Sequence, residues 1–392
     1  VLLEWQQDRL VGLRHERGRS ITVEWADGLV SAIAASDGRR VEYGYDDSGR
    51  LVSASGPLGV RSYSWDAAGL IAAVVDADGV VEASNTYDEA GRVTSQTSAF
   101  GRTTRYGYLP GRVTVVSDAD GTRSNTWIAD PKGRLVGIID ADDARQSMAY
   151  DRWGNLVMVT GRDGSTTLTE YDDRGRRVRQ VTPTGADLQW GYDASDRVTT
   201  VIAEAGTVTT YRYTGDSRNP CELVDPTGGV TLMDWADGLL ARITDPAGVV
   251  VGFGYDEHGD LIATTDAQGN TARLERDTAG RVTAAITPLG HRTSYTYHAN
   301  GTLASRRNPD GGIWRYEHTA AGRLAGIIDP LGGRTVIEHG PHGEESRTID
   351  PLGRAVYAAV TSGVDIDDET VADYHRRNPT RVVCNGSFNL GD

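Results

Sequence analysis

The apolar residues of this chain follow a period of two over short segments. Val282, Ala284 and Ile286 occupy every second position of one such segment. Aromatic residues recur in the same way, as pairs separated by one residue: Tyr43/Tyr45, Tyr63/Trp65, Tyr106/Tyr108, Trp190/Tyr192, Tyr211/Tyr213 and Phe253/Tyr255. Alternation of this kind is typical of half-buried β-strands rather than helices. The sequence therefore predicts an all-β fold.

Tight turns separate these segments at intervals of ten to twelve residues. One kind of turn has the pattern Asp-x-x-Gly, as at 46–49, 88–91, 172–175 and 277–280, and the other has the pattern Asp-Pro-x-Gly, as at 225–228, 245–248, 329–332 and 350–353. Asp at the first position caps a type I turn, and Gly accepts the positive φ that follows. Strands of about six or seven residues joined by such turns can only pair antiparallel.

Two strands and two turns form a repeat of about 21 residues. Its marker is the position just before the Asp-x-x-Gly turn, which we call the aromatic slot. The slot recurs at 17 positions: Trp5, Trp25, Tyr45, Trp65, Tyr87, Tyr108, Ala129, Tyr150, Tyr171, Tyr192, Tyr213, Trp235, Tyr255, Arg276, Tyr297, His318 and His339. Internal repeats of this period define the architecture of a chain. We expect an antiparallel β-meander of about 17 repeats over residues 1–357.

A ribbon of this length is expected to curl. Roughly 34 strands spaced about 4.8 Å apart would extend about 160 Å. Sheets twist with a fixed hand, and sheets of many strands curl or split. The lumen of one closed ring would be too wide for side chains to fill. We therefore expect the meander to coil into part of a hollow β-shell. Its open edge strands favour self-association.

The pattern Tyr-Asp-x-x-Gly-Arg-Leu/Val followed by Asp-Pro-x-Gly resembles the RHS or YD repeat. The resemblance is clearest at residues 45–51, 87–93 and 350–354, and it covers about residues 1–357. The family includes bacterial Rhs polymorphic toxins, insecticidal toxin-complex C components and animal teneurins. The resemblance implies that the repeats spiral into a hollow shell, which in the bacterial toxins encapsulates a C-terminal effector domain before delivery to a target cell.

The chain departs from that family at its C-terminal end. Bacterial RHS proteins usually finish with a core region that closes the shell and in many members cleaves itself at an aspartate. Here Asp350–Gly353 is followed by Arg354, Ala355 and Val356, as in an ordinary repeat, so no autoprotease residues are assigned. Residues 358–392 break the period and contain the acidic run Asp365–Glu369. We interpret them as a non-repeat tail, a linker or the truncated start of a C-terminal region.

Composition and charge exclude several classes of partner. Only 38% of the 392 residues are hydrophobic, while 48 are Gly, which argues against an ordinary core. The formal net charge is −15, and Lys132 is the only lysine, so neither nucleic acid nor an anionic membrane surface is an expected partner. No apolar run approaches the roughly 20 residues of a membrane span. No signal peptide is recognised in the sequence, so a secreted or cell-surface location rests on the resemblance.

Three groups of residues are candidates for metal or redox sites. Asp76–Gly79 and Asp118–Gly121 resemble fragments of a calcium loop but lack its later ligands, which favours turn capping. Slot residues His318 and His339, followed by His342, Glu344 and Glu345, could gather metal ligands, but a degenerating aromatic slot is the favoured interpretation. Cys221 and Cys384 do not make a disulfide framework and are interpreted as small hydrophobic residues.

No residue is nominated as catalytic, cofactor-binding or metal-binding, because no phosphate loop, zinc motif or nucleophile elbow is present. The leading hypothesis is a non-enzymatic shell segment of an Rhs-type toxin, whose partners are its own C-terminal effector cargo and a secretion apparatus. The alternative is a cell-surface adhesion module whose aromatic rows bind carbohydrate. Cross-strand packing of those rows is the simpler explanation of the aromatic slot. An enzyme with its site in the His-rich repeats or the tail is a third, weaker hypothesis.

Overall fold

The computed structural model describes residues 1–121 and 123–357; the tail and its acidic run, together with Cys384, lie outside the described residues. The described chain contains 35 β-strands and a single short 3₁₀ turn at Glu204–Gly206, which confirms the predicted all-β class. No helix among these residues is long and apolar enough to span a bilayer.

The strands are three to seven residues long. The first eighteen are β1 (Leu2–Gln6), β2 (Arg9–Arg14), β3 (Ser20–Ala26), β4 (Leu29–Ala35), β5 (Arg40–Tyr45), β6 (Leu51–Gly56), β7 (Gly59–Trp65), β8 (Ile71–Val75), β9 (Val81–Tyr87), β10 (Val93–Ser98), β11 (Thr103–Leu109), β12 (Val113–Asp118), β13 (Ser124–Ala129), β14 (Leu135–Ile139), β15 (Arg145–Tyr150), β16 (Leu156–Thr160), β17 (Thr166–Tyr171) and β18 (Arg177–Val181).

The remaining strands are β19 (Asp187–Tyr192), β20 (Val198–Ile202), β21 (Val208–Arg212), β22 (Glu222–Val224), β23 (Val230–Ala236), β24 (Leu239–Thr244), β25 (Val250–Tyr255), β26 (Leu261–Thr265), β27 (Thr271–Arg276), β28 (Val282–Ile286), β29 (Arg292–Tyr297), β30 (Leu303–Arg307), β31 (Ile313–His318), β32 (Leu324–Ile328), β33 (Arg334–His339), β34 (Glu345–Ile349) and β35 (Ala355–Tyr357). The 17 slots account for the expected 34 strands, β1 to β34, and β35 is one more strand after them.

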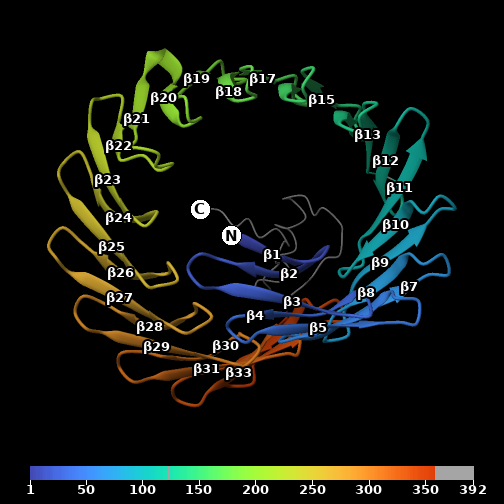
Figure 1. The fold of residues 1–392 in the computed structure, drawn as a ribbon. Helices are drawn as coiled ribbons and strands as arrows, with labels where there is room; N and C mark the ends of the chain where they lie inside the picture. Colours follow the sequence, from blue (N-terminus) through green and yellow to red (C-terminus); the bar gives the residue numbers. More distant parts are fainter. Residues whose placement is uncertain (122, 358–392) are drawn as a thin grey trace. The chain divides into compact units, whose positions relative to one another are not determined.

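Successive strands pair antiparallel, as the turn lengths predict (Figure 1). About half of the pairs contain an irregularity, and nearly all of these irregularities fall at the aromatic slot, where the strand that carries the slot pairs with the strand that follows it. Gly44 pairs with Ser53 while Tyr45 pairs with Leu51, so one extra residue stands on the returning strand. The same shift occurs at Tyr171 and at His339. A bulge of this kind bends the strand and increases its local twist, and the alternating pattern alone did not predict it.

The turns have the predicted chemistry. The Asp46 carboxylate accepts hydrogen bonds from the backbone amides of Ser48 and Arg50, both at 2.9 Å. The amide of Gly49 donates to the Asp46 carbonyl at 2.8 Å, and Gly49 has a φ of 75°. This is a type I turn closed by a residue in the left-handed region, which a side chain at position 49 would strain.

Very few side chains are buried completely. Among the described residues the buried apolar side chains are Val23, Ala32, Val80 and Ala284, and none of them is large. Most strand residues are half-exposed instead. The expectation that the chain lacks an ordinary core is therefore confirmed. Hydrogen bonds and cross-strand pairs must then contribute much of the specificity of the fold.

The described chain divides into two compact units. Unit 1 contains residues 1–104 and 274–357, and unit 2 contains residues 105–273. In unit 2 the strands follow one another in chain order. In unit 1 the two stretches of chain also touch, because the turn between β8 and β9 contacts the turn between β31 and β32 across 241 residues of sequence (Figure 1).

Candidate functional site

The aromatic slot makes a repeated hydrogen bond. The hydroxyl of Tyr150 donates to the carbonyl of Leu135, 15 residues earlier, at 2.9 Å. The indole N–H of Trp25 does the same toward Leu10 at 2.9 Å. Further tyrosines whose hydroxyls bond the carbonyl 15 residues earlier are Tyr45, Tyr171, Tyr192, Tyr213, Tyr255 and Tyr297. Each of these slot residues therefore ties its own repeat to the preceding one.

An arginine four residues after the turn aspartate completes the unit. Arg281 bonds the Asp277 carboxylate through two nitrogens at 2.8 and 2.7 Å, and its guanidinium lies 4.6 Å from the ring centroid of Tyr297 in the next repeat. The same arrangement places Arg134 over Tyr150, Arg176 over Tyr192 and Arg197 over Tyr213. Stacking of a guanidinium on an aromatic ring is attractive. These contacts favour packing as the role of the slot.

The turn carboxylates are held in their charged form. The Arg92 side chain, with its backbone amide, lowers the pKa of Asp88. At Asp193 the backbone amide of Arg197 is the main cause of a lowered pKa. Hydrogen bonding to the charged form of a carboxyl stabilises that form. The repeated aspartates thus act as anionic turn caps.

The calcium alternative was tested at two turns. The Asp76 carboxylate accepts the amides of Asp78 and Val80 at 3.0 and 2.9 Å, so it caps its own turn as interpreted. The Asp118 carboxylate accepts the amide of Arg123 at 3.2 Å. Across residues 1–121 and 123–357, no group of three His, Cys, Asp or Glu side chains is placed to hold a metal ion.

The slot histidines His318 and His339 have different neighbours in the structure. His318 lies against His298, with ring centroids 5.8 Å apart and an interplanar angle of 76°. The Nδ1 atom of His318 is buried without a hydrogen-bond partner, and burial together with His298 lowers its pKa. His339 instead lines a separate cavity of about 470 Å³, beside Pro341. The structure thus does not bring His318 and His339 together as ligands.

Cys221 is a free, half-buried cysteine. Its backbone amide donates to the Arg212 carbonyl at 2.8 Å, and its sulfur lies 3.4 Å from the same oxygen. These contacts give Cys221 a structural role.

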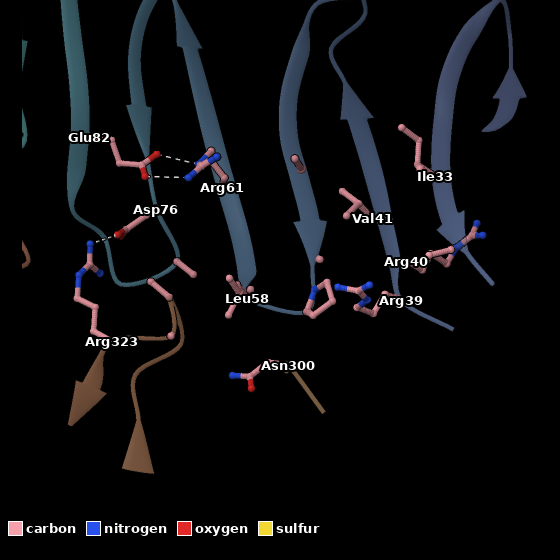
Figure 2. Close-up of a pocket in the computed structure, with 18 of the residues that line it drawn as sticks. Ile33, Arg39, Arg40, Val41, Leu58, Arg61, Asp76, Glu82, Asn300 and Arg323 are labelled. Carbon is pink, nitrogen blue, oxygen red and sulfur yellow. Dashed lines mark hydrogen bonds and ion pairs between the residues drawn. The ribbon is translucent and has the colours of Figure 1, made fainter. Parts of the chain in front are cut away.

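The most distinctive cluster joins the β8–β9 and β31–β32 turns of unit 1 (Figure 2). Arg323 donates to both Asp76 and Asp78, each at 2.5 Å. Asp78 also accepts the Thr319 hydroxyl at 2.6 Å and the Ala321 amide at 3.0 Å. Only 7% of the Asp76 side chain and 26% of the Arg323 side chain are exposed. We call these five residues the interturn clamp.

A cavity of about 650 Å³ lies beside the clamp. Ile33, Val41 and Leu58 supply apolar lining, and Arg61 faces Glu82 on one side at 2.7 Å (Figure 2). Other lining arginines are also paired, because Arg39 bonds Asp37 and Arg40 bonds Glu24. Apolar side chains therefore line part of the cavity, and the arginines around it are paired with carboxylates.

The sequence did not predict the clamp. The local sequence explains Asp76 and Asp78 through their own turn, and nothing in it indicates a partner 241 or more residues away. One signal was present in retrospect. Thr319 stands where most repeats have the turn aspartate, so Arg323 lacks the carboxylate that its counterparts bind.

Two protein-family models match most of the repeat segment. Residues 60–227 match the Teneurin YD-shell model. Residues 25–61, 235–271, 276–313 and 297–335 match the RHS Repeat model. The two models together thus account for both units of the structure.

Curated relatives share part of this chain. Toxin protein Tse5 of Pseudomonas aeruginosa is 30% identical over 143 residues, which cover 30% of this chain and 11% of that protein. Double-stranded DNA deaminase toxin A of Burkholderia cenocepacia is 28% identical over 188 residues, or 40% of this chain and 13% of that protein. Probable deoxyribonuclease RhsB of Dickeya dadantii is 28% identical over 142 residues, or 30% of this chain and 10% of that protein. The match thus spans about a tenth of each relative.

Two solved structures show the same fold. The crystal structure of TcdB2-TccC3-Cdc42 aligns with a TM-score of 0.53 at 18% identity, over 85% of this chain and 22% of that one. The Photorhabdus luminescens Tc holotoxin pore aligns with a TM-score of 0.54 at 17% identity, over 85% of this chain and 22% of that one. At this level of identity the likeness concerns the fold alone.

Proposed function

Because the chain belongs to the RHS/YD-repeat family, we propose that it is a wall segment of the shell of an Rhs-type polymorphic toxin. The shell encapsulates a C-terminal effector and helps to deliver it. In this proposal residues 1–357 are the repeat wall, and residues 358–392 are a non-repeat tail, a linker or the truncated start of a C-terminal region. The chain's partners are then the effector cargo and a secretion apparatus, and its location is secreted or at the cell surface.

The observation that carries this proposal is the uniform repeat itself. The same Asp-Arg pair recurs in both structural units, from Asp46 to Arg354. In several repeats the arginine also lies over the aromatic ring of the next slot, as Arg176 does over Tyr192. The polar atoms of these side chains bond to neighbouring repeats, which is what a wall requires and what an active site does not. The names of two relatives describe toxins and a third a deoxyribonuclease, and the fold matches that of the TcdB2-TccC3 structures.

The charged side chains also suit a container. Arg292 of β29 bonds Glu275 of β27, two strands away, at 2.6 Å, and Arg334 of β33 bonds Glu317 of β31 at 2.7 Å. Arg40 bridges Glu24 and Glu42. Exposed pairs of this kind contribute little stability each, but they neutralise charges within the wall. Arginines paired in this way attract a cargo less than unpaired arginines would, while the chain keeps its net charge of −15.

Protease protection tests this proposal. The full-length polypeptide that carries this segment is treated with a broad-specificity protease, with its C-terminal effector alone as the control. The proposal predicts that the effector survives in the full-length protein at a protease concentration that digests it when free. Equal digestion of the effector in both samples would contradict encapsulation.

Exposed tryptophans favour one alternative, a carbohydrate-binding or adhesion module. Trp153 is 64% exposed and Trp127 is 45% exposed, and neither occupies an aromatic slot. Exposed aromatic rings of this kind suit stacking on sugars. The alternative predicts binding on a glycan array that Trp153→Ala and Trp127→Ala remove. The container proposal predicts no binding by this segment.

A further inference from the structure

The turn that begins at Thr319 departs from the arrangement shared by the turns that have aspartate at the first position and arginine at the fifth. In those turns the aspartate carboxylate accepts the amides of the third and fifth residues and also bonds the guanidinium of the arginine at the fifth position. Turns that follow this rule begin at Asp46, Asp88, Asp130, Asp172, Asp193, Asp277 and Asp350. Each of these arginines is therefore held by its own turn.

Thr319 replaces only half of that arrangement. Its hydroxyl accepts the amide of Arg323 at 3.1 Å, as the Asp277 carboxylate accepts the amide of Arg281 at 3.0 Å. A hydroxyl offers no second oxygen and no charge to a guanidinium. The amide of Ala321 and the side chain of Arg323 consequently have no local carboxylate.

Asp78 supplies the missing carboxylate from a turn far away in sequence. It accepts the Ala321 amide at 3.0 Å, which matches the 3.0 Å bond from Ala279 to Asp277 in a regular turn. It also accepts the Arg323 guanidinium, while Asp76 accepts the other terminal nitrogen. One substitution within a repeat thus redirects a local contact into a contact between two stretches of chain.

The backbones at this contact approach closely. Gly322 has a φ of 87°, and a β-carbon at that position would lie 2.8 Å from Cδ2 of Leu58. A β-carbon on Gly59 would likewise lie 2.5 Å from that of Ala77, with the Ala320 carbonyl at 3.6 Å. Such spacing leaves no room for a water layer at these positions. Because Asp76, Asp78 and Arg323 are largely buried there, each charge depends on the others.

We propose that the interturn clamp is a conformational latch that fastens the β31–β32 turn to the β8–β9 turn and sets the spacing of the two stretches of unit 1. Thr319 makes the latch possible because it leaves Arg323 free to bind Asp76 and Asp78. The latch goes beyond the proposed container function and does not depend on any cargo. Opening it would expose the 650 Å³ cavity that borders Arg323.

Thr319→Asp is the most discriminating variant. It restores the residue found in the regular turns, so it gives Arg323 and Ala321 a local partner. It also places a second carboxylate beside Asp78, whose oxygen lies 2.6 Å from the Thr319 hydroxyl. The latch account therefore predicts that a change toward the regular repeat separates the two turns. Thr319→Ser, which keeps the hydroxyl, is the matched control.

Arg323→Ala removes the latch directly, and Arg281→Ala is its control at the equivalent position of a regular turn. Hydrogen–deuterium exchange is followed for the amides of residues 76–80 and 319–323 in the full chain. We expect Thr319→Asp and Arg323→Ala each to speed exchange in both turns by at least about tenfold. We expect Thr319→Ser to leave both turns unchanged and Arg281→Ala to affect only its own neighbourhood.

Two results would overturn the latch. One is unchanged exchange at residues 76–80 in both Thr319→Asp and Arg323→Ala. The other is an equal increase at residues 76–80 in Arg281→Ala, which would show a general loss of stability rather than a specific contact. A double variant, Asp78→Ala with Arg323→Ala, adds a quantitative check, because coupled residues should give less than the sum of the single effects.

Discussion

The hydroxyl of Tyr213 lies 2.7 Å from the carbonyl oxygen of Val198 and donates a hydrogen bond to it. This bond joins one repeat to the repeat before it, and burial raises the pKa of the Tyr213 hydroxyl, which keeps it protonated as a donor. The same bond recurs along both units, so the stability of the array is expected to depend on it.

Tyr213→Phe should therefore destabilise the protein by about 0.5–1.5 kcal/mol, the usual net contribution of a hydrogen bond. Urea unfolding followed by circular dichroism measures the change. Tyr211→Phe is the control, since Tyr211 lies two residues away on β21 and does not occupy an aromatic slot. Equal midpoints for the two variants would contradict a structural role for the slot hydroxyl.

The arginines of the repeat differ in how many partners they have. Arg197 bonds Asp193, covers Tyr213 and donates to the carbonyls of Gly215 and Ser217. Arg354 bonds Asp350 alone and is 75% exposed. Arg197→Ala should lower the thermal midpoint by about 2–4 °C or more, and Arg354→Ala should change it little. Scanning calorimetry measures the thermal midpoint of both variants. An equal decrease in the two would show that the additional partners of Arg197, including the stacked ring, contribute nothing to stability.

Acid should destabilise the array through its turn aspartates. Their pKa values are lowered from the ordinary value of 3.8, as at Asp88, Asp163 and Asp266, chiefly by hydrogen bonds to the carboxylate. A carboxyl whose folded pKa is lowered contributes stability above its unfolded pKa and loses it as the pH falls through the folded value. The contribution of these aspartates to the urea midpoint should stay level above about pH 5 and fall below about pH 4. A midpoint that rises on acidification would contradict this account.

His318 should give the array a second, weaker pH dependence. Burial, aided by His298, lowers its pKa from 6.5, so the folded protein favours the neutral ring. A histidine of this kind takes up a proton more readily when unfolded, and stability is lost as the pH falls below its unfolded pKa. We expect the urea midpoint to decline between about pH 7 and pH 5. In His318→Tyr this decline should be reduced.

That variant has a further expected effect. Tyrosine would restore the usual slot residue, whose hydroxyl can reach the Leu303 carbonyl, 15 residues earlier as in the regular repeats. His318→Tyr should therefore raise stability at neutral pH, as consensus substitutions often do. A lower midpoint than the wild-type protein at pH 7.5 would show that the His298 contact matters more than the slot bond.

The sequence was sufficient for the features that local chemistry determines. An Asp at the start of a turn caps it and a Gly at its end accepts a positive φ, so the strand boundaries around Asp46 and Gly49 could be predicted. The bulge at Tyr45 could not be predicted, because it depends on how two strands pair with each other. The interturn clamp depends on residues that are distant in sequence, and Thr319 becomes informative only once the regular Asp-Arg pair is known.

Cryo-electron microscopy of the full-length polypeptide tests the container proposal most directly. The account predicts that residues 1–357 form a wall around density that continues from the C-terminal region. An open wall, or a closed wall around an empty lumen, would contradict encapsulation and favour recognition at the surface instead.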